Sequence, residues 1–354
     1  MSELDYLNAR LRAMRGFLLS RQDYEQILAL PDLPAVMAYL LDSPYGRSIE
    51  SVGEATSDVA RVEEGLRRNF SETLAKLFAI STGEPQEGVR LLLGYWDIYN
   101  LRTILRGKNG RLPAEEILPS LIPTGFLDEA ALEELCRQPD LYAVVNLLVT
   151  WRSPYGRPLI LALKDYHEPK DLLFLELVLD RFYFEQAFGK LEQARFTHSD
   201  RDALQMILSL LVDRTNLMTA LKVVEEQITL VDKERYFLSG GRVYTEQDFD
   251  RLMAARTLQE ALEGARRSLF EPALRDLEQP PGGISLLSMV ERQLDRVLLR
   301  KIRALMRTDP VGMAAVASYL LDKIREIANL RMILRGRLVN LPEPELLRFL
   351  ILEY

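Results

Sequence analysis

Apolar residues recur at helical spacing along almost the whole chain. Two clear runs are Leu4, Leu7, Leu11, Met14 and Leu18, and later Leu172, Leu175, Val178 and Phe182. Steps of three and four residues place such side chains on one face of an α-helix, and no stretch sustains the two-residue alternation of a β-strand. Segments containing glycine and proline interrupt the runs and mark the connections. The pattern predicts an all-α protein with short loops.

One polar pattern occurs three times in the chain. Glu-x-x-Leu-x-Arg stands at Glu63 and Arg68, at Glu176 and Arg181, and at Glu291 and Arg296. An asparagine follows each glutamate by 37 to 40 residues and has an acid three residues before it, giving Asp97 and Asn100, Asp213 and Asn216, and Glu326 and Asn329. Self-similarity at a period near 113 residues predicts a triplicated helical unit, which we assign to residues 1–107, 108–228 and 229–354.

The long helices that carry the asparagines resemble one another closely. Asn100–Gly107 nearly repeats as Asn329–Gly336, and a further copy stands at Asn8–Gly16. The middle copy, 216–224, lacks the glycine, so we expect that helix to run on. Four asparagine-type helices against three glutamate-type helices predict an open or asymmetric arrangement.

The triplicated polar residues have a structural and a functional interpretation. Glu63 and Arg68 are five residues apart and therefore point roughly 140° from each other on a helix. We predict that each arginine bonds the acid or asparagine of a neighbouring long helix, is largely buried and fixes the register, because buried polar groups need partners. The alternative is a binding site with threefold symmetry.

A second recurring element is the turn Ser-Pro-Tyr-Gly-Arg at Ser43–Arg47 and Ser153–Arg157, with an altered form at Ser268–Glu271. Proline second and glycine fourth suit a type I turn that ends the preceding helix. The tyrosine either packs locally at this corner or projects toward a partner. In the second case the interface residues are Tyr45, Arg47, Tyr155 and Arg157, since tyrosine and arginine are enriched at binding hot spots.

Composition narrows the range of functions. The chain of 354 residues has 48% apolar and 27% charged residues, which is ordinary for a globular protein of more than one core. A net charge of −7 argues against nucleic-acid binding, which needs a basic surface. The longest apolar stretches fall short of the ~20 residues that span a bilayer, so we expect no transmembrane segment.

Signatures of catalysis and metal binding are missing. The single cysteine, Cys136, excludes an internal disulfide and a thiolate metal cluster, and suits a reducing compartment. Neither His167 nor His198 has a metal-ligand companion at helical spacing. The chain contains no phosphate-binding loop and no nucleophile elbow. We therefore predict no catalytic residue, no cofactor and no metal.

The three helical units, the Ser-Pro-Tyr-Gly turns and the Asn-Leu-Arg-x-Ile-Leu-Arg-Gly helices together resemble the C-subunit family of the prokaryotic V/A-type rotary ATPases, whose counterpart in the eukaryotic vacuolar ATPase is the d-type subunit. The resemblance covers the whole chain. It implies a funnel of three helical units around a pseudo-threefold axis. It also implies a non-catalytic rotor part, one copy per complex, that lies on the cytoplasmic face of the membrane.

The partners that the resemblance implies are the central shaft subunits and the membrane proteolipid ring, between which torque passes during proton or sodium transport. Two other readings stay open from the residues alone: a helical-repeat scaffold of an unrelated soluble complex, and an all-α enzyme acting on a lipid-like substrate. Nothing in the residues says which ion is transported or in which direction the complex works.

Overall fold

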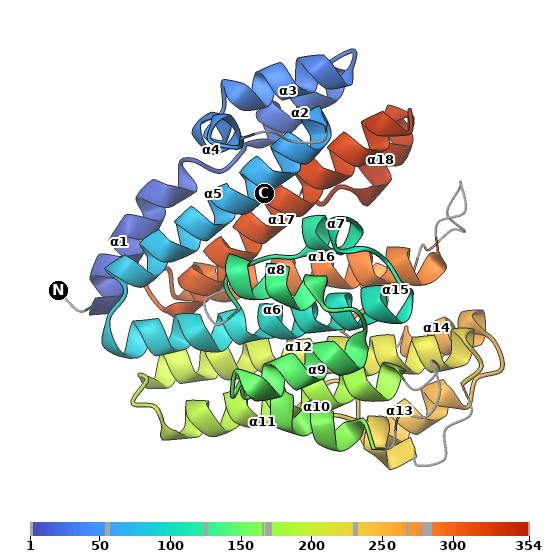
Figure 1. Cartoon of the computed structure of the whole chain (residues 1–354). Coiled ribbons are helices and arrows are strands. Elements are labelled where there is room, and N and C mark those ends of the chain that lie inside the picture. The colour runs from blue at the N-terminus through green and yellow to red at the C-terminus, as the bar shows by residue number, and fades with distance from the viewer. Residues whose placement is uncertain are drawn as a thin grey trace. The chain divides into compact units, whose positions relative to one another are not determined.

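The computed structural model describes residues 3–53, 57–123, 127–164, 166, 172–228, 233–266, 269–275, 277 and 285–352. Over these residues the chain forms helices and no β-strand (Figure 1), which confirms the all-α class. No helix among them is long and apolar enough to cross a membrane. The pseudo-threefold axis and the funnel shape stay predictions.

The described chain divides into two compact units. The first comprises residues up to 183 together with 319–352, and the second comprises residues 184–318. The first unit contains α1 (Glu3–Arg15), α2 (Arg21–Ala29), α3 (Leu33–Leu41), α4 (Gly46–Glu50), α5 (Asp58–Ile80), α6 (Gly83–Asn109), α7 (Ala114–Ile117), η1 (Leu118–Ser120), α8 (Glu129–Arg137), α9 (Leu141–Thr150), α10 (Gly156–Ala162) and α18 (Glu343–Phe349).

The second unit contains α12 (His198–Glu225), η3 (Lys233–Tyr236), α13 (Glu246–Met253), α14 (Leu258–Ala265), α15 (Glu271–Leu274) and α16 (Leu286–Thr308). The unit boundaries fall within α11 (Leu172–Gln193) and α17 (Met313–Leu338). The repeat ranges 1–107, 108–228 and 229–354 describe similarity along the sequence rather than compactness, and they stay a prediction.

Many helix starts are explained by the residue just before them. Asp32, Asp128 and Asp140 each accept a hydrogen bond from the backbone N–H three residues on, as do Ser57 and Thr257. Such N-caps satisfy donors that a helix cannot satisfy internally, and each contributes about 1 kcal/mol.

The long asparagine-type helices all stop at one place relative to the asparagine. α6, α12 and α17 each end nine residues after it, and the eleventh residue after it takes a left-handed conformation, at Arg111 (φ 56°), Gln227 (φ 50°) and Asn340 (φ 53°). The next backbone N–H then bonds a carbonyl five residues back in each copy. This is the common left-handed helix stop.

The expectation that the middle helix runs on is therefore wrong. The stop does not depend on the glycine that this copy lacks. Gly107 and Gly336 serve another purpose, because a Cβ there would lie 2.5 Å from Ile117 Cδ1 and 2.3 Å from Leu346 Cδ2. They let the following short helix pack closely.

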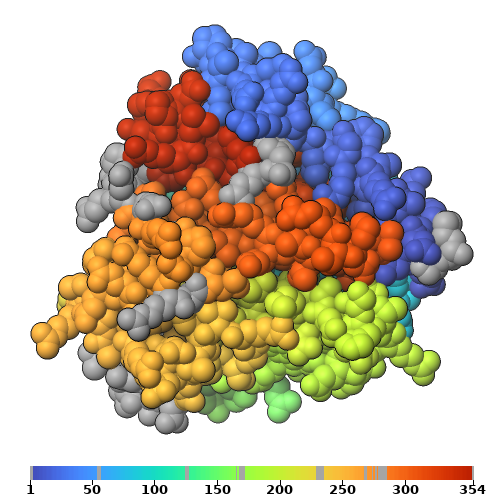
Figure 2. Space-filling model, turned by 180° about the vertical axis from the view of Figure 1, so that it is seen from behind, coloured from blue at the N-terminus to red at the C-terminus, as the bar shows by residue number. Residues whose placement is uncertain are grey.

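In the first unit, the N-terminal helices lie against the C-terminal ones. Figures 1 and 2 show the blue N-terminal helices beside the red C-terminal ones. Two backbone-anchored bonds join them: Leu19 N–H donates to Glu326, and Arg337 donates to Leu28 O over 2.5 Å. Tyr24, Tyr45 and Phe70 fill the core of this region.

Candidate functional site

The three repeated asparagines form identical clasps. Asn100 Oδ1 accepts from Ile122 N over 2.8 Å, and its Nδ2 donates to Ile122 O over 2.5 Å. Asn216 holds Leu238 in the same way, with distances of 2.9 and 2.8 Å, and Asn329 holds Ile351, with 3.1 and 3.0 Å. Each partner lies 22 residues further along, and all three asparagines are fully buried.

An amide is the side chain that offers one donor and one acceptor in a plane, as a peptide group does. Each asparagine therefore pairs with the backbone of an extended segment and fixes it against the long helix. Sequence reasoning identified these residues but not their partner, since a backbone partner leaves no side-chain signal in the sequence.

The acids three residues before the asparagines accept hydrogen bonds from loops and corners. Asp97 accepts from Leu127 N over 3.3 Å and from the Tyr155 hydroxyl over 3.1 Å. Glu326 accepts from Leu19 N and from the Tyr45 hydroxyl. In both places the acid ties a loop and a Ser-Pro-Tyr-Gly corner to the long helix.

The middle copy satisfies its acid without a hydroxyl. Asp213 accepts from three consecutive backbone N–H groups, of Arg242, Val243 and Tyr244, at 2.8 to 3.1 Å. Burial raises the pKa of Asp213, and these backbone bonds oppose the rise. The altered turn supplies Phe270, which is buried and stacks on Tyr244 with ring centroids 6.3 Å apart. Ser268 lies outside the described residues.

The turn residues separate into buried tyrosines and exposed arginines. Tyr45 is 0% and Tyr155 is 7% exposed. Burial, and in second place the neighbouring acid, raises the pKa of both phenols. The hypothesis that these rings project toward a partner is therefore corrected: they bond the buried acids. Arg47 and Arg157 are exposed at the same corners, so the arginines alone remain candidates for the interface.

Close backbone approach at the glycine shapes both corners. A Cβ on Gly46 would lie 1.9 Å from Leu41 O, and one on Gly156 would lie 2.7 Å from Val149 N. The helix after the turn therefore packs on the backbone of the helix before it, which turns the tyrosine inward and the arginine outward.

The glutamate of each repeat makes a pair between two long helices. Glu176 on α11 binds Arg106 of α6. Glu63 on α5 binds Arg335 of α17 over 2.6 Å. In the second unit, Arg214 of α12 binds Glu291 at 3.0 Å and Asp295 at 2.8 Å.

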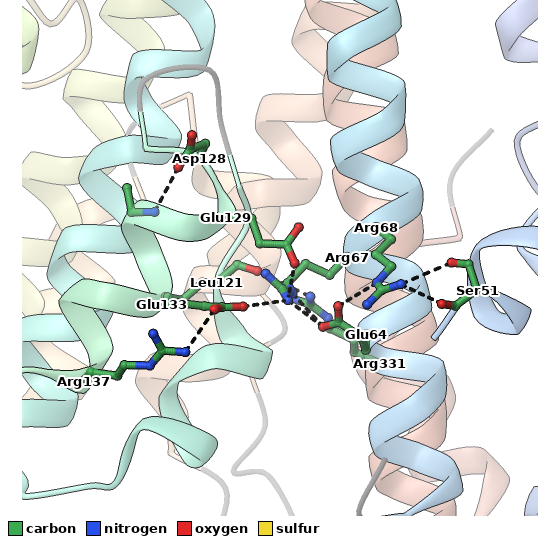
Figure 3. A network of polar contacts seen from close by, with 11 residues as sticks. Ser51, Glu64, Arg67, Arg68, Leu121, Asp128, Glu129, Glu133, Arg137 and Arg331 are labelled. Atoms are coloured by element: carbon green, nitrogen blue, oxygen red, sulfur yellow. Dashed lines mark hydrogen bonds and ion pairs between the residues drawn. The ribbon is translucent and has the colours of Figure 1, made fainter. Parts of the chain in front are cut away.

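Arg68 differs from the expectation that the repeated arginines are largely buried and bond a neighbouring long helix. Arg68 bonds Glu64 on its own helix at 3.0 Å and Ser51 O at 2.8 Å, and its side chain is 38% exposed (Figure 3). Arg296 is half-buried and bonds Gln293 on its own helix at 3.2 Å, while Arg181 is also half-buried. Arg68 stands five residues after Glu63, roughly 140° round the helix, and therefore points away from the helix that Glu63 reaches.

Sequence reasoning missed Arg67, a cation of the first unit that contacts three acids. It reaches from α5 to α8 and lies 2.7 Å from Glu64, 2.7 Å from Glu129 and 3.6 Å from Glu133 (Figure 3). Its side chain is only 8% exposed. Because the other two copies carry Asp180 and Asp295 at this position, no repeat pattern pointed to it.

Potential metal-ligating residues were the remaining candidates for site chemistry. No group of three or more potential metal-ligating side chains comes together among them. His198 is 90% exposed at its side chain and lies 3.1 Å from Asp202, and His167 falls outside the described part of the chain. The polar clusters hold helices and loops together.

The sequence matches known proteins over almost its whole length. The sequence model of the family described as ATP synthase (C/AC39) subunit matches residues 7–349. The chain is 30% identical over 350 residues to the C-type subunit of the A-type ATP synthase of Halorubrum lacusprofundi, covering 98% of this chain and 96% of the relative. It is 24% identical over 348 residues to the protein of the same name from Methanocaldococcus jannaschii, covering 98% and 86%.

Proposed function

Because the chain belongs to the ATP synthase (C/AC39) subunit family, whose members are non-catalytic subunits of the rotary ATPase, we propose that it is the central-rotor adaptor of such a complex. In this role it links the central shaft to the membrane proteolipid ring, one copy per complex. It lies at the cytoplasmic face as a peripheral subunit held through the ring. Torque passes through it during proton or sodium transport.

The observation that carries this proposal is the repeated locking of long helices in a chain of this family. Torque is transmitted only by an element that deforms little under load. Each asparagine clasp fixes a backbone segment with two hydrogen bonds, and each repeated glutamate joins two long helices. Fully satisfied buried polar networks rigidify the structure around them.

Two exposed corners supply candidate contacts to the ring or shaft. Each presents an arginine beside an exposed aliphatic residue: Arg47 beside Leu41, which is 39% exposed, and Arg157 beside Val149, which is 42% exposed. Similar corners suit a partner that offers similar surfaces more than once, as a ring of identical subunits does. Family membership disfavours the unrelated scaffold and the lipid enzyme.

Removal of the subunit from the purified complex tests the proposal. ATP hydrolysis and ion pumping are measured separately in reconstituted vesicles, with proton and sodium each followed. We expect hydrolysis to persist and pumping to disappear, and pumping should return when the purified chain is added back. Pumping that continues in its absence would eliminate the adaptor role.

The corner arginines are tested in the same assay. Arg47→Glu combined with Arg157→Glu should reduce rebinding of the chain to the depleted complex while its melting temperature stays unchanged, because both side chains are exposed. Arg256→Glu combined with Arg307→Glu, also at exposed positions, is the matched control. Equal rebinding of the double variant and the control would remove the corners from the interface.

A further inference from the structure

A pocket of about 390 Å³ opens in the first unit where the end of α1, the first Ser-Pro-Tyr-Gly corner, α5 and α17 meet. Phe17 and Tyr319 supply aromatic walls. Three cations from three different elements line it, Arg47, Lys76 and Lys323, with one acid, Glu72. The pocket therefore combines apolar walls with converging positive charge.

Lys323 is the buried cation of this pocket. It is 5% exposed, and its ammonium lies 2.8 Å from the Tyr45 hydroxyl, 3.2 Å from Glu326 Oε1 and 4.2 Å from the centre of the Tyr45 ring. An ammonium has three N–H donors. Two have oxygen acceptors, and the third has none within the described part of the chain. Burial lowers the pKa of Lys323, which Glu326 opposes, so a further anion would favour the charged form.

The repeated scaffold does not require this cation. Three residues before the acid, the other copies carry Gly94 and Leu210 in place of Lys323. At Gly94 a Cβ would lie 3.0 Å from a carbon of the Tyr183 ring, a close contact that the ring would have to relieve by moving.

The other lysine of the pocket is also found in a single copy, the first, whereas Lys323 belongs to the third. Thirteen residues after the repeated glutamate, the other copies carry Gly189 and Ala304 where the first has Lys76. The two lysines come from separate helices, α17 and α5, yet both line this one pocket. A shared folding requirement would have placed lysines in all three copies.

The surplus of charge is about one unit. The three cations face Glu72 at the mouth and Glu326 beside Lys323, which leaves one positive charge uncompensated. A singly charged anion matches this balance better than a doubly charged phosphate. The mouth carries Phe17, which is 61% exposed, so an apolar group next to the anion would gain contact area there.

We propose that this pocket is the socket for an acidic segment of a neighbouring subunit, with one carboxylate inside the pocket and an apolar side chain against Phe17. The identity of the partner as a subunit of the rotary complex rests on the proposed function. The carboxylate accepts the third Lys323 N–H, and Arg47 and Lys76 flank it at the mouth. The pocket thereby distinguishes the junction of α5 with α17 from the two corresponding junctions, α11 with α6 and α16 with α12, whose helices carry neither lysine.

Photocrosslinking in the assembled complex tests the socket. Phe17 is replaced by p-benzoylphenylalanine, which an exposed site accommodates, and the crosslinked peptide is identified by mass spectrometry after irradiation. We expect one dominant crosslink to another subunit, at a segment with a carboxylate beside an apolar residue. A crosslink to lipid, to a segment without a carboxylate, or to nothing would overturn the proposal.

A charge reversal gives a second readout. Lys76→Glu should weaken rebinding to the depleted complex by about tenfold, since a flanking cation becomes a repelling anion. Lys190→Glu, at another exposed lysine, should leave rebinding unchanged, and both variants should keep the wild-type melting temperature. Equal rebinding of the two variants contradicts the socket but not the adaptor role, provided that removal of the whole subunit still abolishes pumping.

Discussion

The helices α6 and α17 are two copies of the same repeated helix. The helices beside them, α11 and α5, carry opposite charges at one repeat position. Arg102 and Arg331 both stand two residues after the asparagine. Arg102 binds the buried Asp180 of α11 at 2.8 Å. On α5, beside α17, Arg67 stands at the repeat position of Asp180. Arg331 therefore has no counterpart of the acid that Arg102 binds.

At this junction of α5 with α17, Arg67 and Arg331 each contact other groups. Arg67 lies among Glu64, Glu129 and Glu133, two of which belong to α8. Arg331 donates to Leu121 O at 3.4 Å, while its Nε has no hydrogen-bond partner among the residues that the structure describes. Burial lowers the pKa of Arg331 to about 10, although Glu63 opposes the shift. A repeat can therefore reverse a buried charge when a neighbouring short helix supplies the missing opposite charges.

The largest expected effect comes from removing Arg102. Arg102→Met leaves the carboxylate of Asp180, which is 2% exposed, without this cation, and breaking a buried ion pair costs about 3–5 kcal/mol. Denaturant unfolding of the isolated chain measures the loss. The matched change Arg331→Met should alter the free energy of unfolding by less than about 1 kcal/mol, because methionine keeps the packed stem. Equal losses at the two positions would show that the junctions are energetically alike.

A smaller loss is expected at the compensating cluster. Arg67→Met leaves Glu64, Glu129 and Glu133 around an apolar side chain, at a cost of about 1–3 kcal/mol. Hydrogen exchange of α8 should speed up locally, since two of these glutamates stand on it. Arg137→Met serves as control, because the Arg137 side chain is 65% exposed and such surface pairs contribute little. Unchanged exchange in α8 would mean that Arg67 does not hold this helix.

The smallest expected effect is a change in melting temperature at the end of α12, the asparagine-type helix of the middle copy. Gln227 stops α12 with a φ of 50°, a conformation that costs a residue with a side chain about 1 kcal/mol. Gln227→Gly should therefore raise the melting temperature slightly. Asn340→Gly should raise it less, since asparagine tolerates the left-handed conformation. A lower melting temperature for Gln227→Gly would indicate that the glutamine side chain contributes packing.

The sequence predicted the features in which the same residue type recurs in every copy. It did not predict contacts made by backbone atoms, or residues that differ between the copies. Helical periodicity was sufficient for the fold class. The triplicated glutamates and asparagines were identified as structural, but the clasps at Ile122, Leu238 and Ile351 use main-chain atoms that no sequence pattern marks.

Two other misses share a physical cause. The left-handed stop of α12 occurs at a glutamine, although glycine is the usual signal. Arg67 differs in sign from its counterparts, so a search for triplicated residues passes over it. Burial of Tyr45 and Tyr155 was one of two readings, and the close approach at Gly46 and Gly156 decided between them.

The bonds from Glu326 to Leu19 and Tyr45 set an order for synthesis of the chain. They join positions 307 and 281 residues apart, so the first unit cannot close while the ribosome is still making α17. The second unit occupies one uninterrupted stretch, 184–318, and can reach its native contacts earlier. At about 5–20 residues per second, the N-terminal helices wait many seconds for their C-terminal partner. During that time the apolar faces of the N-terminal helices are exposed to solvent, and a chaperone that binds apolar surface would act at this stage.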